Sequence, residues 1–209
     1  MVFVAGWALW FVVVWARYGH PARSGPSDPL LDSAMPVYEV RELHAIRIAA
    51  SPARAFAAAR ALDLERSWIV RAIFRGRELA FALPPQRPAP RPFVESMLSI
   101  GWGLVAERPG RELVFAAVTQ PWRANVVFRP LERAQFVAFD SADYVKIAWT
   151  LAVDSLGPEE SRFRTETRVV TTDAAARARF RRYWALFSPG IVLIRWVAVR
   201  LVRDEAERR

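Results

Sequence analysis

Two side chains that could transfer protons stand close together in the first strand-like segment. Glu42 precedes His44 by two positions, and His20 is the only other histidine among the 209 residues. Residues two apart in a β-strand point to the same face, so Glu42 and His44 would lie side by side. A histidine–carboxylate pair on the wall of a cavity can move protons. The alternative is a structural pair at the rim of a sheet.

Other chemical motifs do not occur in the sequence. The chain has no cysteine, which excludes disulfides, thiolate zinc sites and cysteine nucleophiles. Two histidines as far apart as His20 and His44 do not predict a histidine-rich metal site. The segment Gly101-Trp102-Gly103 lacks the third glycine of a dinucleotide-binding loop, and there is no nucleophile elbow. We therefore expect no metal, no cofactor and no covalent catalysis.

The formal net charge of +9 comes almost entirely from arginine. Lys146 is the only lysine, and the arginines are scattered rather than gathered between stacking aromatic residues. No nucleic-acid partner is therefore expected, and a weak preference for anionic surfaces is the remaining consequence. Within residues 161–171, Glu166 and Arg168 share one charged face. We expect a solvated ion-pair ladder there, the alternative being groups that orient a polar ligand head.

The elements that must position these residues follow one order. Alternation of apolar and polar residues predicts strands, and Ser51-Pro52 ahead of an alanine-rich run predicts a helix start. Arg108-Pro109-Gly110 predicts the turn of a hairpin. The predicted strands cover residues 38–49, 99–107, 111–118, 124–128, 135–140, 143–154 and 161–171. The predicted helices cover residues 51–62, 67–81 and 173–203.

The last helix carries an apolar stripe at helical spacing. Ser188-Pro189-Gly190 interrupts this stripe and predicts a kink or a break. Residues 83–92 contain five prolines and predict an extended loop, either a stiff surface connection or a lid beside a cavity. The stripe consists of Phe180, Trp184, Phe187, Ile191, Ile194, Ala198 and Leu201.

The N-terminus is hydrophobic. Residues 2–16 (VFVAGWALWFVVVWA) are uncharged, and as a helix they would span about 22 Å, which is short of a hydrocarbon core of roughly 30 Å. Trp15 and Tyr18 would extend the segment as interfacial anchors. The segment lacks a basic start and a small-residue cleavage site, so residues 1–18 predict an uncleaved membrane anchor, on a side that the sequence does not define.

Residues 19–35 contain three prolines and two glycines, a composition typical of a linker. We therefore predict one folded domain over residues 36–209 behind an anchor and a linker. Two alternatives remain for the hydrophobic segment. It could be a buried helix, or it could precede a true start at Met35, which would leave a cytoplasmic protein.

Three local phrases and the element order carry a resemblance. They are the opening Ile48-Ala-Ala-Ser-Pro-Ala-Arg-Ala-Phe56, Gly101-Trp-Gly-Leu104 with the following turn, and Thr165-Glu-Thr-Arg-Val169 before the final helix. From residue 38 to about residue 203 the chain resembles bacterial members of the START-like (SRPBCC) superfamily. That superfamily includes polyketide cyclases and the Bet v 1 type. The resemblance implies an α+β helix-grip fold, in which a curved antiparallel sheet of about six to seven strands wraps around the C-terminal helix.

The resemblance also implies an apolar cavity between sheet and helix that holds a lipid, a polyketide or another apolar molecule. The inward faces are rich in aromatic residues that would line it; the alternative is that they fill the core. Polar groups that could face it are Glu42, His44 and Tyr144. A register one residue off would also bring Lys146 inside. The aromatic candidates are Trp102, Phe115, Trp149, Phe163, Phe180, Trp184 and Phe187.

These features predict a membrane-tethered domain that binds or transports an apolar small molecule or lipid. A cyclase- or hydratase-type enzyme in the same fold is the first alternative. The second is a non-catalytic interaction module, in which an exposed apolar stretch over residues 191–202 contacts a partner or a bilayer.

Overall fold

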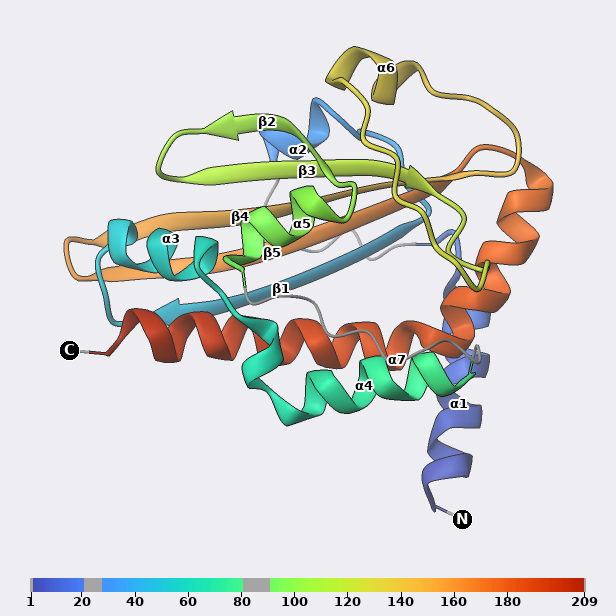
Figure 1. Ribbon diagram of the computed structural model, residues 1–209, viewed down its shortest axis with the longest axis horizontal. Helices are drawn as coiled ribbons and strands as arrows, with labels where there is room; N and C mark the ends of the chain where they lie inside the picture. Colours follow the sequence, from blue (N-terminus) through green and yellow to red (C-terminus); the bar gives the residue numbers. More distant parts are fainter. Residues whose placement is uncertain (1, 21–27, 81–90, 209) are drawn as a thin grey trace.

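The computed structural model describes residues 2–20, 28–80 and 91–208, and most of the predicted proline-rich loop lies outside them. The described strands form one antiparallel sheet in the order β1-β5-β4-β3-β2. A long C-terminal helix packs on one face of this sheet, so the predicted α+β helix-grip fold is confirmed (Figure 1). The strands are β1 (Val40–Ile48), β2 (Gly103–Arg108), β3 (Glu112–Thr119), β4 (Val145–Gly157) and β5 (Glu160–Thr171).

Helices lie on both faces of the sheet (Figure 1). The inner face is covered by α7, α3 and α5, whereas α2 and α6 lie on the outer face. α4 runs alongside α7. The helices are α1 (Val2–Arg17), α2 (Pro29–Asp32), α3 (Pro52–Arg60), α4 (Trp68–Ala80), α5 (Phe93–Ser99), α6 (Arg133–Ala138) and α7 (Ala174–Ala206), with a 3-10 turn at Leu64–Arg66.

The described sheet has five strands rather than six to seven. Residues 135–140, predicted as a strand, fall mostly in α6, whose first turn is closed by reciprocal hydrogen bonds between Glu132 and Gln135. Residues 124–128 contain no strand, and next to them Arg129 makes one isolated bridge to Val118. Periodicity does not separate strand from helix in such short segments, which explains both errors.

Two apolar clusters fill the inner face. In the first, here called the sheet cluster, the rings of Phe115 and Trp149 stack with centroids 4.4 Å apart. The second, the helix-start cluster, joins the first half of α7 to β1, β4 and β5. The sheet cluster includes Trp102, Phe115, Trp149, Phe163, Val199 and Val202. The helix-start cluster consists of Tyr18, Val40, Val145, Val169, Phe180 and Trp184.

The predicted interruption of the last helix is a bend. α7 continues from Ala174 to Ala206 through Pro189 and changes direction along its length (Figure 1). Proline lacks the N–H that a helix interior needs, which accounts for the bend. α1 docks beside this region, where the Trp10 indole Nε1 donates to Ser188 Oγ at 2.9 Å.

The expected membrane-anchor segment is partly built into the domain. The buried Tyr18 donates its hydroxyl to Glu39 Oε2 at 2.7 Å, and Arg181 Nη2 donates to the carbonyl of Trp15 at 2.6 Å. The start of α1 projects away from the domain (Figure 1). The segment therefore has one end fixed to the fold and apolar side chains exposed elsewhere.

Residues 28–35, which we expected to belong to a linker, pack on the outer face and are here called the strap. Asp28 and Leu31 are fully buried, and Met35 is nearly so. Asp28 Oδ1 accepts a hydrogen bond from the Leu31 amide at 3.0 Å and thereby caps α2. The prolines and glycines of residues 19–35 predicted irregular backbone, but they did not reveal that residues 28–35 pack against the sheet.

The charged face of β5 lies beneath the strap, so the predicted ion pairs are present but their predicted exposure to solvent is wrong. Arg164 Nη1 donates to Asp28 Oδ2 at 2.5 Å. Arg168 donates to Glu166 Oε1 and to the carbonyl of Met35, both at 2.8 Å. The alternation of the strand is the same whether its second face meets water or a covering segment, which is why periodicity alone misled the prediction.

Candidate functional site

A polar cluster interrupts the apolar inner face between the two hydrophobic clusters. It consists of Glu42, His44, Thr165, Thr167 and Arg195, here called the polar step. β1 and β5 pair antiparallel with Glu42 opposite Thr167 and His44 opposite Thr165, so these four side chains share the face toward α7. Arg195 reaches the same place from α7, where its Nη1 donates to Thr165 Oγ1 at 3.2 Å.

Apolar residues continue the inner face on both sides of the polar step. On β1, Val40 belongs to the helix-start cluster, and Ile48 belongs to the sheet cluster. On β5, Val169 and Phe163 occupy the corresponding positions. The polar step is therefore a short polar band with apolar surface beyond each end.

Three atoms of the polar step are buried without a hydrogen-bond partner in the described structure: His44 Nε2, Thr167 Oγ1 and Arg195 Nε. The nearest approach between His44 Nε2 and Glu42 Oε2 is 3.9 Å, which is too long for a hydrogen bond. Buried polar atoms are nearly always paired, so three such atoms in one place point to a missing partner.

Burial controls the ionisation of the polar step. It lowers the pKa of His44 to about 4, with the positive charge of Arg195 contributing, so the imidazole is neutral at neutral pH. It raises the pKa of Glu42, against the opposing effect of Arg195. Burial also lowers the pKa of Arg195 to about 10, opposed by Glu42, and leaves the guanidinium charged at neutral pH. A single fixed positive charge thus lies among poorly solvated groups.

Trp196 lies at the outer side of the polar step. Its ring meets the His44 imidazole edge-on, with centroids 6.2 Å apart. About half of the Trp196 side chain remains exposed, and β1 is an edge strand of the sheet. The side chain therefore separates the polar step from solvent at the open edge of the grip.

The structure divides the predicted aromatic candidates between the two clusters. Phe180 and Trp184 belong to the helix-start cluster, whereas Phe187 lies half-buried on α7 against Tyr183, with centroids 5.0 Å apart. The sheet cluster contains Trp102, Phe115, Trp149 and Phe163. These seven side chains therefore do not surround one point, and a ligand that contacted both groups would cross the polar step.

Of the predicted polar groups, the structure brings Glu42 and His44 together and places Tyr144 elsewhere. The Tyr144 hydroxyl accepts from Arg129 Nη1 at 3.0 Å, and its side chain packs on the outer face against an apolar cluster that includes Leu31, Val118 and Phe136, here called the outer-face cluster. The prediction of Tyr144 as an inner-face group is therefore wrong. The physical reason is parity, since Tyr144 is an odd number of residues from Trp149. Lys146 also faces outward, as predicted, and donates to the carbonyl of Val137 at 2.8 Å.

Arg195 is the residue of the polar step that the sequence analysis did not identify. Arg195 is not part of the apolar stripe predicted for the last helix, so that stripe provided no reason to place it inside the fold. The available signal was spacing, since Arg195 follows Ile191 by four residues and precedes the buried Val199 by four. Thr165 and Thr167 were correctly placed on the face of Phe163, but they were not considered as ligand-binding groups.

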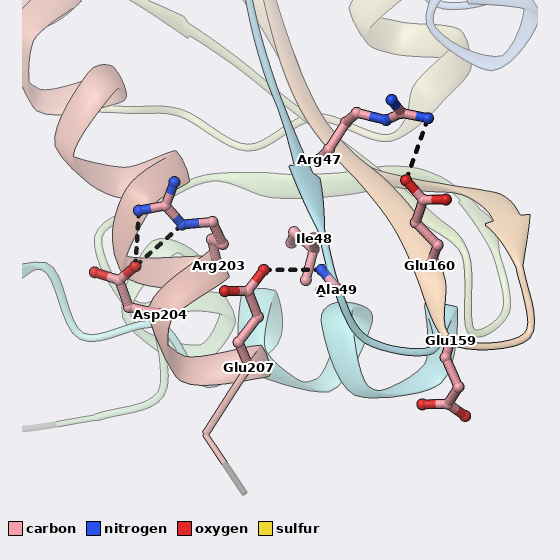
Figure 2. A pocket seen from close by; sticks show the side chains of 8 residues that line it. All are labelled: Arg47, Ile48, Ala49, Glu159, Glu160, Arg203, Asp204 and Glu207. Carbon is pink, nitrogen blue, oxygen red and sulfur yellow. Dashed lines mark hydrogen bonds and ion pairs between the residues drawn. The ribbon is translucent and has the colours of Figure 1, made fainter.

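A surface depression at the far end of α7 is a weaker candidate (Figure 2). Most of its charged groups already have partners: Arg47 Nη2 lies 3.2 Å from Glu160 Oε1, and Glu207 Oε1 accepts from the Ala49 amide at 2.8 Å. No group of three or more metal-ligating side chains occurs in the part of the chain that the structure describes. The depression is lined by Arg47, Ile48, Ala49, Glu159, Glu160, Arg203, Asp204 and Glu207.

No protein-family model matches the chain, and no curated protein matches it. Among solved structures, the hypothetical protein jhp0584 from Helicobacter pylori is 6% identical over 89% of this chain and 98% of that chain, with a TM-score of 0.41. The Zhui aromatase/cyclase from Streptomyces sp. R1128 is 14% identical over 81% and 94%, with a TM-score of 0.29. The di-domain ARO/CYC BexL from the BE-7585A biosynthetic pathway is 10% identical over 81% and 50%, with a TM-score of 0.33. These identities define no ligand, so the site is interpreted from its own residues.

Proposed function

We propose that the chain binds an apolar small molecule or lipid between the inner face of the sheet and α7. The supporting observation is the set of three buried, unpartnered polar atoms between two apolar clusters. A ligand with an apolar body and one polar end would complete these hydrogen bonds and bury its body against aromatic side chains. No step of this function requires a cofactor or a covalent intermediate.

Native mass spectrometry of protein purified without detergent tests this proposal. We expect an added mass that organic solvent extracts, and a lower occupancy of that mass in Thr167→Val. Thr150→Val is the matched control, because Thr150 is also a buried strand threonine but lies on the outer face. A wild-type chain that carries no added mass and binds no apolar dye would contradict the proposal.

We propose in addition that α1 holds the domain at a membrane. α1 has large apolar side chains exposed next to its docked end, and its N-terminus points away from the domain (Figure 1). By length and composition alone, α7 is the described helix that would suffice to cross a membrane; its packing on the sheet accounts for only part of its apolar residues, because Leu186, Leu193 and Trp196 are exposed. The exposed side chains of α1 are Trp7, Leu9, Trp10, Val12 and Val13.

Flotation with lipid vesicles tests the membrane proposal. We expect the full chain to float with vesicles and a Leu9→Gln/Val13→Gln variant to remain in the soluble fraction. These two substitutions leave the Trp10–Ser188 hydrogen bond in place, so the domain should unfold at an unchanged temperature. Equal flotation of both chains would assign membrane contact to another surface, such as the exposed Leu193 and Trp196 of α7.

One observation favours an enzymatic version of the same site. Burial raises the pKa of Glu42 and lowers that of His44, so the environment favours the acid form of Glu42 and the base form of His44 in the same polar step. Such a pair would serve a cyclase- or hydratase-type proton transfer on a bound polyketide-like substrate. Turnover that is unchanged in His44→Ala would exclude this version while leaving ligand binding intact.

A further inference from the structure

Arg195 differs from the buried arginines of the outer face in having no described carboxylate within ion-pair distance, although Glu42 acts on it electrostatically. No oxygen of a described carboxylate lies within 4.0 Å of its nitrogens, and Thr165 is its one described hydrogen-bond partner. The buried arginines of the outer face each have an acidic partner at 2.5 to 2.8 Å, in the pairs Arg41–Glu166, Arg164–Asp28 and Arg168–Glu166. The same chain therefore pairs its arginines on one side of the sheet and leaves one unpaired on the other.

One kind of ligand group could satisfy all the unpaired donors of the polar step. A guanidinium has five N–H donors and no acceptor, and the Nε of Arg195 is buried without a partner. The Thr167 hydroxyl and the neutral His44 imidazole can also donate, and both have unpartnered atoms. A group with several acceptor oxygens and a negative charge satisfies these donors together, whereas an alcohol would leave the charge unpaired.

We infer that the polar step is an anion subsite. This inference rests on the proposed binding function and adds that the polar end of the ligand is a carboxylate or phosphate held by Arg195. The two apolar clusters on either side then accommodate its hydrocarbon part. Glu42 is the one acidic side chain of the polar step, and burial raises its pKa, which favours its uncharged form beside a bound anion.

Binding of four probes to the full chain tests the inference: hexadecanoate, hexadecyl phosphate, hexadecanol and inorganic phosphate. We expect the two long-chain anions to bind at least about tenfold more tightly than the alcohol, as a buried charge-assisted contact implies. Arg195→Met should reduce this preference to within about twofold. Arg200→Met is the control, because Arg200 lies five residues further along α7, exposed over the Trp196 ring, and its loss should leave the preference unchanged.

The outcomes separate this inference from the binding function on which it rests. Hexadecanol binding as tightly as hexadecanoate, or a preference that survives in Arg195→Met, overturns the anion subsite and leaves apolar binding standing. Inorganic phosphate binding as tightly as the long-chain anions supports the subsite and overturns the apolar function. Arg195→Lys keeps the charge and should retain part of the preference, so it provides the same comparison if the methionine variant does not fold.

Discussion

Asp28 and Arg164, which are 136 positions apart in the chain, form the ion pair that fixes the strap to the outer face of the sheet. The carboxylate is fully buried, and the guanidinium is also near Asp154 and Glu112. Removing Asp28 would leave the buried guanidinium with only its longer contacts, to Asp154 at 3.3 Å and to Glu112 at 3.5 Å. The strap should therefore contribute to the stability of the domain and not merely connect it to α1.

Asp28→Asn should lower the free energy of unfolding by about 2 kcal/mol, because Arg164 loses its shortest charged contact but keeps the longer contacts to Asp154 and Glu112. Asp32→Asn is the matched control, because Asp32 pairs with Arg168 but is half-exposed, and Arg168 keeps Glu166 as a second partner. We expect a loss below about 1 kcal/mol for the control. Urea unfolding measures both values, and equal losses would show that the strap is not held by the Asp28 pair.

A chain that begins at Met35 lacks both Asp28 and Leu31. We expect it to unfold at a clearly lower urea concentration than a chain that begins at Gly19, because Arg164 loses the closest of its buried acidic partners and the outer-face cluster loses a fully buried leucine. Both chains lack α1, so the comparison isolates the strap. Equal unfolding midpoints for the two chains would mean that residues 19–35 act only as a linker.

The two threonines Thr167 and Thr150 provide a stability test of the polar step. Thr150 Oγ1 accepts from the Glu166 amide at 3.1 Å, whereas Thr167 Oγ1 is buried without a partner. Replacing threonine by valine should therefore destabilise the chain by about 1 kcal/mol at position 150 and leave it unchanged or slightly more stable at position 167. A comparable loss at both positions, seen in thermal unfolding, would mean that Thr167 is already satisfied.

The ionisation of His44 gives a pH-dependent prediction. Its pKa lies at about 4 in the folded chain, against an ordinary value of 6.5. As the pH falls from 6.5 to 4, the unfolded chain takes up a proton that the folded chain does not, so the stability contributed by neutral His44 is lost over this range. His44→Gln should lose less stability than the wild type over the same range.

Nuclear magnetic resonance can follow this titration directly. His20→Gln leaves His44 as the only histidine, and its imidazole signal should titrate near pH 4. A midpoint above pH 6 would show that the polar step is open to water, contrary to the burial of His44 Nε2.

Strand alternation predicted much of the fold correctly. Val145, Trp149 and Phe163 point inward as their positions indicated, because a residue pattern of period two fixes which side chains share a face. The helix-grip order and the kink at Pro189 were also predictable from local signals. Residues 135–140 were not, since the capping interaction of Glu132 outweighs a weak alternation there.

The strap and Arg195 show where local patterns stop being informative. The charged residues of β5 read as a solvated face, and only the packing of Asp28 and Leu31 on them shows that they are buried. Similarly, Arg195 resembles the exposed arginines of α7 in sequence and differs from them only in what surrounds it. Both depend on contacts between residues far apart in the chain, which no local pattern encodes.

A crystal structure of the chain with a bromine-labelled long-chain carboxylic acid tests the central claim most directly. We predict anomalous signal from the bromine among the aromatic side chains of the sheet cluster or of the helix-start cluster. The carboxylate should lie within hydrogen-bonding distance of Arg195 and Thr167. A fully packed inner face with the acid bound only in the surface depression of Figure 2 would contradict the account.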